Sequence, residues 1–392
     1  MKNRRNFIKL LGLALPSISP LPVYGSKHPA NLDTVVIIGA GAAGMAAGHL
    51  LAQNGINFKI LEAAPTYGGR MKHDTELTDF PIPLGAEWLH VKESELSAIV
   101  NDDSVHIDTT TQRYKTSDTY GEYDDGSLTI SEIGIMGLWA THDRKFINSS
   151  WLSFFEQYIL PSVQSKIAFN TQVKSINYWD TTIKLTDQKG KVYEAAKVII
   201  TVPAKILQNN TISFTPALPD KKLSTLEEAD IWDGFKCFLE FGEKFYPTFL
   251  ELANSDSDTG QHLYYDAAYG QNTSSNVLGL FAVGTEAEPY QSLSGDAQRD
   301  YILDELDEIF AGKASQHYIQ HIAQDWSAEP YIQSAYLSNH AATATSRILA
   351  ASVDQKLYFA GEAYTKEDDW AAVHNAARSA KDAVEEILGH RV

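Results

Sequence analysis

The stretch from residue 34 to residue 71 constrains the fold most, because glycines follow a short apolar run at a fixed spacing. Val35–Ile38 are all β-branched and apolar, which predicts a strand buried on both faces. Gly39, Gly41 and Gly44 follow in the spacing GxGxxG and lead into an alanine-rich segment that predicts a helix. The N-terminus of such a helix offers N–H groups and partial positive charge to a phosphate. The stretch therefore predicts a βαβ unit that binds a dinucleotide.

The residues after this helix complete the unit. The first glycine permits a tight turn, the second lets backbone approach a pyrophosphate, and the third lets helix and strand pack closely. Gly55 suits the end of the helix, and Phe58–Leu61 predict a second parallel strand. Glu62 ends that strand, where a carboxylate can accept hydrogen bonds from ribose hydroxyls. NAD and FAD both fit these features.

A second glycine motif distinguishes between FAD and NAD as the expected cofactor. Gly68, Gly69 and Arg70 follow shortly after Glu62. In this order the motifs resemble the FAD-binding signature of the flavin amine oxidase superfamily, which includes monoamine and polyamine oxidases, L-amino-acid oxidases and flavin histone demethylases. The resemblance implies that Arg70 lies beside the FAD pyrophosphate and ribityl chain. It also implies cofactor contacts from Ala43 and Gly69.

Three later blocks extend the resemblance. Residues 84–90, LGAEWLH, are similar to a family segment that passes beside the flavin. Residues 168–203 alternate like a three-stranded meander that leads into a buried strand at 198–202. Residues 357–362 resemble the closing FAD motif, and a helix is expected from about 371 to 388 with its N-terminus toward the flavin. The cofactor contacts that these blocks imply are Gly85, Ala86, Glu87, Trp88, Val173, Gly361, Glu362 and Val373.

The expected architecture is α/β, with a Rossmann-like FAD-binding domain and a discontinuous α+β substrate domain. The FAD-binding domain should combine a parallel sheet with the β-meander. We expect it to comprise residues 33–90, 165–208 and 352–390, and the substrate domain to comprise residues 91–164 and 209–351.

The segment Asp233–Phe241 alternates like a strand and contains the candidate catalytic residue. It resembles the family segment whose lysine is hydrogen-bonded through a water to flavin N5, which implies that role for Lys236. A lysine buried between aromatic residues is costly unless paired, and burial lowers its pKa. A solvent-facing edge-strand lysine is the alternative. Desaturase-type relatives generally lack this lysine, so Lys236 favours amine oxidation.

Four residues are candidate substrate contacts. Trp326 belongs to a segment that resembles the family's Trp–Pro stretch, and it lies either near the flavin or in the core. Many amine oxidases carry an aromatic residue just before the final helix, where this chain has Ala372, and Trp370 is the candidate substitute. His374 falls where some relatives carry histidine, and it either contacts substrate or only begins the helix.

The resemblance implies an FAD-dependent amine oxidase. A hydride passes from an amine C–H to flavin N5 to give an imine, and O2 (forming H2O2) or another acceptor reoxidises the flavin. Cys237 lies outside the usual covalent-flavin position, so the FAD is expected to be non-covalent. Two alternatives remain open: a desaturase or protoporphyrinogen-type dehydrogenase with the same FAD domain, and a catalytically degraded flavin-bound binding or assembly protein.

The amino terminus predicts export. Residues 1–25 contain a basic head and an apolar run, Phe7–Pro16, that is shorter than the ~20 residues a bilayer span needs. Arg4 and Arg5 resemble a twin-arginine signal, and a Sec signal is the alternative. The expectation is a protein loaded with FAD in the cytoplasm, recognised by the twin-arginine machinery and delivered folded to the periplasm or outside the cell.

Charge and composition limit the classes of molecule that the protein is expected to bind. The net charge of −18 disfavours nucleic acid and anionic lipid and can steer cationic substrates. The single cysteine excludes an intrachain disulfide, and the 12 histidines show no metal-ligand spacing. We therefore expect a small amine as substrate, O2 or another electron acceptor, no metal, no nucleic acid and no stable membrane span.

Overall fold

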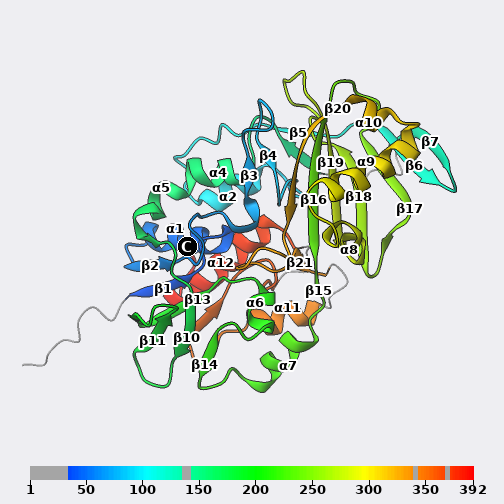
Figure 1. Ribbon diagram of the computed structural model, residues 1–392. Coiled ribbons are helices and arrows are strands. Elements are labelled where there is room, and N and C mark those ends of the chain that lie inside the picture. The colour runs from blue at the N-terminus through cyan, green and yellow to red at the C-terminus, as the bar shows by residue number, and fades with distance from the viewer. Residues whose placement is uncertain (1–33, 135–142, 339–342, 367–370) are drawn as a thin grey trace, which may run out of the picture. The chain divides into compact units, whose positions relative to one another are not determined.

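The computed structural model describes residues 34–134, 143–338, 343–366 and 371–392 (Figure 1). The expected signal peptide and Trp370 lie outside these residues. Within them, no helix combines the length and the apolar character that crossing a bilayer requires.

A five-stranded parallel sheet carries the glycine motifs. Its strand order is β22-β13-β1-β2-β9, and every neighbouring pair is parallel. Two strands coincide residue for residue with the expectation, β1 (Val35–Ile38) and β2 (Phe58–Leu61). The others are β9 (Ile167–Ala168), β13 (Lys197–Ile200) and β22 (Leu357–Phe359). The α/β fold and the Rossmann-like arrangement are thus confirmed.

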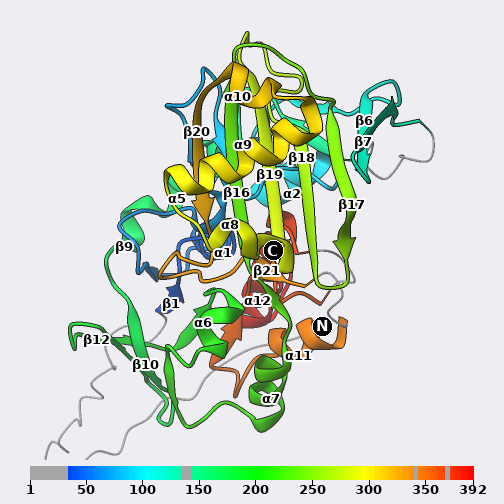
Figure 2. The ribbon, with the colours of Figure 1, turned by 45° about the vertical axis from the view of Figure 1, so that its right-hand side comes forward.

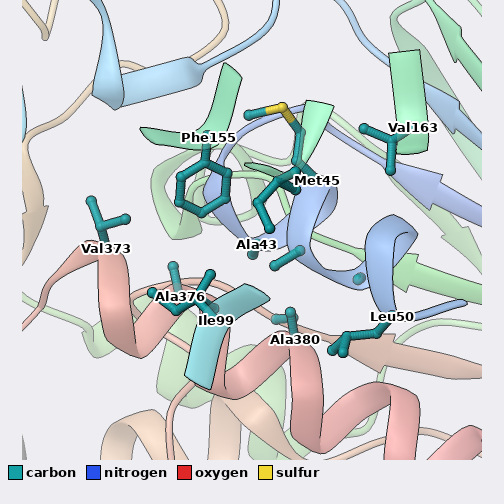
Figure 3. Packing of buried hydrophobic residues seen from close by; sticks show 14 of the residues in the cluster. Ala43, Met45, Leu50, Ile99, Phe155, Val163, Val373, Ala376 and Ala380 are labelled. Atoms are coloured by element: carbon teal, nitrogen blue, oxygen red, sulfur yellow. The ribbon is translucent and has the colours of Figure 1, made fainter. Parts of the chain in front are cut away.

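Helices cover one face of this sheet. Alternate strand residues such as Ile37 and Ile60 pack there in one core cluster with side chains from five helices. Figure 3 shows Ala376 and Ala380 of one helix facing Ala43 and Leu50 of another, so small side chains bring the two helices close. The five helices are α1 (Ala42–Gln53), α2 (Ser94–Val100), α4 (Trp151–Tyr158), α5 (Leu160–Val163) and α12 (Val373–Leu388).

The opposite face packs against the meander and three further helices, through Val36, Ile38, Val198 and Ile200. The expected meander is present as β10 (Val173–Asn177), β11 (Ile183–Asp187) and β12 (Val192–Ala195), joined by β14 (Ser213–Thr215). The helices are α6 (Ala204–Gln208), α7 (Asp220–Glu228) and α11 (Thr343–Ala350). Because successive residues of a buried strand face opposite sides, β1 and β13 contribute to both cores.

A second, seven-stranded sheet has the order β20-β16-β19-β18-β17-β6-β7. Figure 2 shows α9 lying across one of its faces. The strands are β6 (Thr119–Asp124), β7 (Ser127–Glu132), β16 (Gly234–Phe241), β17 (Phe249–Ser257), β18 (Gly260–Asp266), β19 (Asn276–Gly284) and β20 (Tyr318–Asp325). The helices that follow β19 are α8 (Glu288–Gln291), α9 (Asp296–Phe310) and α10 (Lys313–His317).

Three two-stranded ladders lie outside these two sheets in the described part of the chain. They are β3 (His73–Asp74) with β4 (Ile82–Pro83), β5 (Thr111–Arg113) with β8 (Arg144–Phe146), and β15 (Ile231–Trp232) with β21 (Tyr336–Leu337). The helices α2, α4 and α5 come from the expected substrate segment 91–164, yet they share a core with α1 and α12. The exact division into domains stays a prediction.

Candidate active site

A cavity of about 1470 Å³ extends from the glycine motifs to one face of the seven-stranded sheet. A site for one small molecule usually measures about 300–1,000 Å³, so this cavity is large enough for a dinucleotide and a second ligand. Most of the residues expected to contact cofactor or substrate line it: Gly39, Gly41, Ala43, Glu62, Gly69, Arg70, Gly85, Ala86, Glu87, Trp88, Val173, Lys236, Trp326, Gly361, Glu362, Ala372 and Val373.

Two glycines of the turn have different roles: Gly44 allows close packing, and Gly41 leaves room for a ligand. A Cβ on Gly44 would lie 1.9 Å from the carbonyl oxygen of Gly39, so only glycine allows α1 to begin this close to β1. Gly44 does not line the cavity, in agreement with its packing role. A Cβ on Gly41 would meet nothing within 4 Å, although Gly41 lines the cavity. That open space at the N-terminus of α1 fits the phosphates of a dinucleotide.

Glu62 follows β2 directly and is held by backbone amides. Its carboxylate accepts hydrogen bonds from the N–H groups of Ala40 and Ala64. Burial raises the pKa of Glu62, and the amide hydrogen bonds partly offset this effect. The amides orient a carboxylate at the cavity wall, where ribose hydroxyls can donate to it.

Arg70 joins two motifs that are far apart in the sequence. Its Nη1 lies 3.0 Å from Glu362 Oε1, and it also donates to the carbonyl oxygen of Ala335. Glu362 follows β22, and Leu337 N–H donates to its second carboxylate oxygen. The GGR loop and the carboxyl-terminal motif therefore meet at one side of the cavity. The first turn of α12 contributes Val373 to the same wall, with its N–H groups available to an acceptor.

Gly85 permits a close approach between the GGR loop and Trp326, which follows β20 of the second sheet. A Cβ there would lie 2.0 Å from Arg70 O and 2.8 Å from the ring of Trp326. Trp326 is buried and donates its Nε1–H to Leu84 O at 2.9 Å. Since Trp326 also lines the cavity, it is both a core residue and a wall of the site.

Lys236 is buried and ion-paired, so it is not the solvent-facing edge lysine of the alternative interpretation. Its side chain is 4% exposed, and Nζ lies 2.7 Å from Glu87 Oε2. It also donates to the carbonyl oxygens of Pro83 and Gly85. Glu87, expected to contact the cofactor, lines the cavity and also bridges two lysines, because Lys145 Nζ lies 2.8 Å from its Oε1.

This cluster of Lys236, Glu87 and Lys145 contains two basic groups and one acid. Burial lowers the pKa of Lys236, and Glu87 opposes that shift. Burial alone would raise the pKa of Glu87, but Lys145 and Lys236 outweigh it and hold the carboxyl below its ordinary value. Glu87 is therefore a carboxylate, and at least one lysine must be charged to neutralise it.

Aromatic rings complete the surroundings of Lys236. Its Nζ lies 5.5 Å from the ring centre of Trp88 and 5.4 Å from that of Tyr265. Tyr265 donates its hydroxyl to Glu87 Oε2, and Trp88 donates its Nε1–H to Tyr114. Lys145 and Tyr265 were not among the residues expected from the sequence. Nothing in their local pattern marks them, because their partner Glu87 lies far away in the chain.

Of the four candidate substrate contacts, Ala372 and His374 differ in whether they line the cavity. Ala372 immediately precedes α12 and lines the cavity. His374 is fully buried and, unlike Val373 and Ala376 on the same helix, is not among the lining residues. Within the described residues, no group of three or more His, Cys, Asp or Glu side chains is arranged to hold a metal ion.

Comparison with known protein families gives two matches. Residues 152–388, more than half of the chain, match the family described as flavin containing amine oxidoreductase. Residues 37–102 match the NAD(P)-binding Rossmann-like domain.

Several curated proteins are similar to this chain, over nearly its whole length or over about half of it. Polyamine oxidase 4 of Oryza sativa subsp. japonica is 23% identical, over 97% of this chain and 92% of its own length. Polyamine oxidase 5 of the same plant is 24% identical, over 92% of this chain and 89% of its own length. Lysine-specific histone demethylase 1B of Mus musculus is 25% identical, over 50% of this chain and 25% of its own length.

Solved structures share the fold. Cyclohexylamine oxidase from Brevibacterium oxydans superposes with a TM-score of 0.72 at 15% identity, covering 91% of this chain and 98% of the other. Wild-type putrescine oxidase bound to putrescine superposes with a TM-score of 0.70 at 15% identity, covering 91% and 99%.

Proposed function

Because this chain belongs to the family of flavin containing amine oxidoreductases, we propose that it is an FAD-dependent amine oxidase. Members of the family bind FAD. FAD in the cavity would supply the redox chemistry, taking a hydride from an amine C–H bond to leave an imine and passing the electrons to O2 or another acceptor. The protein supplies binding, orientation and electrostatics.

The walls of the cavity would hold the cofactor without a covalent bond. Gly41 and the N-terminus of α1 suit the pyrophosphate, Glu62 suits the ribose, and Arg70 with Glu362 suits the linker toward the flavin. Cys237 is fully buried in the core cluster beneath α9, and burial raises the pKa of its thiol. A buried, protonated thiol outside the cavity is a poor nucleophile for flavin attachment, which supports non-covalent binding.

The observation that carries the proposal is the buried Lys236 at the cavity wall. Its ammonium group is positioned by Glu87 and by the carbonyl oxygens of Pro83 and Gly85. A positioned lysine can hold a water molecule and deliver or accept a proton at Nζ during cofactor reoxidation. Desaturase-type relatives generally lack this lysine, so its position at the cavity wall supports amine oxidation over desaturation.

Anaerobic mixing of the holoenzyme with mono-, di- and polyamines and L-amino acids tests the proposal. Bleaching of the flavin absorbance by an amine is expected. Tight FAD binding without bleaching by any amine would favour a desaturase-type dehydrogenase or a degraded, flavin-bound binding protein. Lys236→Met should slow reoxidation of the reduced enzyme by O2, whereas reoxidation at the wild-type rate would remove the role proposed for Lys236.

We also propose export by the twin-arginine pathway, on the basis of Arg4 and Arg5 in the amino-terminal segment. Replacing both arginines by lysine should leave the FAD-loaded protein in the cytoplasm. Unchanged delivery to the periplasm would instead indicate the Sec route.

A further inference from the structure

Two lysines share one buried carboxylate beside the cavity. Nζ of Lys236, on β16, lies 2.7 Å from Glu87 Oε2, and Nζ of Lys145, on β8, lies 2.8 Å from Glu87 Oε1. All three side chains are at most 4% exposed. Lys236 and Glu87 line the cavity, whereas Lys145 is not among the lining residues. Of the two lysines, Lys236 is therefore the one that is placed to act on a ligand.

This cluster contains one more basic group than it needs. If both lysines keep their protons, the cluster carries a net positive charge inside the protein, and an unneutralised buried charge is unfavourable. One ammonium group is enough to neutralise Glu87. The lysine that is held less firmly is therefore the one that gives up its proton first.

Lys145 is held more firmly than Lys236 by backbone carbonyl groups. Its Nζ donates to Ala267 O at 2.6 Å and to Asp266 O at 3.4 Å. The shorter carbonyl contact of Lys236, to Gly85 O, measures 3.1 Å. Because hydrogen bonds from charged donors are shorter and stronger than those from neutral donors, the contact to Ala267 favours the ammonium form of Lys145.

Tyr265 weakens the hold of Glu87 on Lys236. Its hydroxyl donates to Oε2, the same carboxylate oxygen that Lys236 contacts. Burial raises the pKa of Tyr265, and the charge of Glu87 adds to the shift, so the phenol keeps its proton. Lys145 is thus placed at Oε1, while Lys236 shares Oε2 with a second donor.

We propose that Lys145 and Tyr265 hold the Glu87 carboxylate, and that Lys236 is in consequence the lysine that exchanges its proton with the cavity. This inference rests on the proposed amine oxidase function, in which Lys236 transfers a proton at Nζ. The proton leaves Nζ for a water molecule or ligand in the cavity and returns from there, while Glu87 stays ionised. Lys145 and Tyr265 are positioning residues, since neither is among the lining residues and both contact Glu87.

The electrostatics of Lys236 agree with this assignment. Burial lowers its pKa, the charge and hydrogen bond of Glu87 oppose that shift, and the charge of Lys145 lowers the pKa further. A like charge disfavours the protonated form of a lysine. Removing the charge of Lys145 should therefore raise the pKa of Lys236, because Glu87 would then be neutralised by Lys236 alone.

Other ionisable groups near the cluster are neutral or have partners of their own. Burial raises the pKa of Tyr114, and the charge of Glu87 adds to the shift, so this phenol stays protonated. On the neighbouring strand β20, the residue opposite Lys236 is the uncharged Gln324. The charged side chains nearby form these pairs: Asp266 with Lys244, Lys72 with Glu329, Arg70 with Glu362, and Asp143 with His90.

Competitive acylation measures the protonation of Lys236 directly. Acetic anhydride reacts with a neutral amine and not with an ammonium group. The fraction of Lys236 that is acetylated, read by mass spectrometry from about pH 6 to 11, therefore gives the midpoint of its titration. Both the FAD-loaded enzyme and the apoprotein are labelled, so the measurement needs no turnover. We expect a wild-type midpoint below that of an ordinary lysine, which is about 10.4.

Variants identify the groups that hold Glu87. Lys145→Met should raise the midpoint of Lys236 by about one pH unit or more. Tyr265→Phe should raise it by less, and this variant decides the question if Lys145→Met does not fold, because it removes only one hydroxyl. Lys244→Met is the matched control, since it also loses one lysine charge, but from the pair with Asp266. It should leave the midpoint of Lys236 nearly unchanged.

Reoxidation of the reduced enzyme by O2 gives a second measurement. The inflection of its pH profile that Lys236→Met abolishes should move to higher pH in Lys145→Met, by the same amount as the acylation midpoint. A purely structural role of Lys145 would lower the Tm and leave this inflection where it is in the wild type.

The outcomes separate the inference from the proposed function. Equal midpoints of Lys236 in the wild type, Lys145→Met and Tyr265→Phe, or an equal shift in Lys244→Met, would overturn the inference. Flavin reduction by an amine would then still support the oxidase function. A higher midpoint in Lys145→Met, without flavin reduction by any amine, would support the assignment within the cluster and overturn the oxidase function.

Discussion

The two ends of the cavity are built in different ways. At the nucleotide end, backbone geometry is decisive, since Gly39, Gly41 and Gly44 lie within six residues of each other in one turn. At the substrate end, side-chain charges are decisive, and the partners Glu87 and Lys236 are 149 residues apart. The nucleotide end is therefore sensitive to the size of a side chain, and the substrate end to its charge.

Two buried lysines illustrate the same difference. Lys222 of α7, on the nucleotide side, donates to the carbonyl oxygens of Ile348 and Leu349 at the end of α11. Lys236, on the substrate side, pairs with a carboxylate. Burial lowers the pKa of Lys222 to about 7, whereas for Lys236 the charge of Glu87 opposes the effect of burial.

The largest effect is expected from Gly44→Ala at the nucleotide end. The added Cβ would lie 1.9 Å from Gly39 O, so the variant should lose more than about 3 kcal/mol of unfolding free energy or fail to fold. Gly41→Ala is the matched control, because its backbone φ of −80° suits alanine and its Cβ meets nothing within 4 Å. It should fold normally and contain less FAD, measured by thermal unfolding and flavin absorbance. Equal stability of the two variants would contradict the division of roles.

At the substrate end, Glu87→Gln should lower the unfolding free energy nearly as much as Gly44→Ala does. It removes the charge that compensates Lys145 and Lys236, and leaving a buried ion-pair partner unpaired costs about 3–5 kcal/mol. Glu93→Gln loses the more exposed ion pair with Arg144 and should cost about 1 kcal/mol or less. Chemical denaturation of both apoproteins measures the difference. If Glu87→Gln were as mild as Glu93→Gln, the cluster would not depend on the carboxylate.

A pH titration of stability distinguishes the two buried lysines. Between pH 7 and about 10.5, Lys222 is deprotonated in the folded state and protonated in the unfolded state. The unfolded state then binds more protons, so the unfolding free energy should rise with pH, by up to about 1.4 kcal/mol per unit from this group. Lys222→Met should remove that contribution, and Lys221→Met, an exposed neighbour, should keep it. Denaturation curves from pH 7.5 to 9.5 measure the slope, and parallel slopes in wild type and Lys222→Met would contradict the shifted pKa.

The smallest effect is expected where the two ends meet. Trp326→Phe keeps most of the ring contact over Gly85 but removes the hydrogen bond to Leu84 O, which is worth about 1 kcal/mol. The unfolding free energy should fall by that amount, and FAD content should stay near wild type. A complete loss of FAD would show that Trp326 supports the nucleotide end as well.

The elements that were predicted correctly depend on local patterns. β1 matches because a β-branched apolar run before a glycine turn is typical of a buried strand. β2 matches because a short, mostly apolar run follows the glycine that ends the preceding helix. The strand around Lys236 and the helix at 373–388 also match, because their periodicity continues over several turns or residue pairs. Lys145 and Tyr265 were missed, since neither carries a motif and each acquires its role from Glu87, which is far away in the chain.

By itself, the sequence determined the nucleotide-binding turn and the family, because a glycine spacing acts through backbone sterics within a few residues. Only the tertiary structure decided that Glu87 bridges two lysines and accepts a hydrogen bond from Tyr265. Electrostatic partners act through space at distances of a few ångströms, and the strand register that brings them together is set by the packing of the whole sheet.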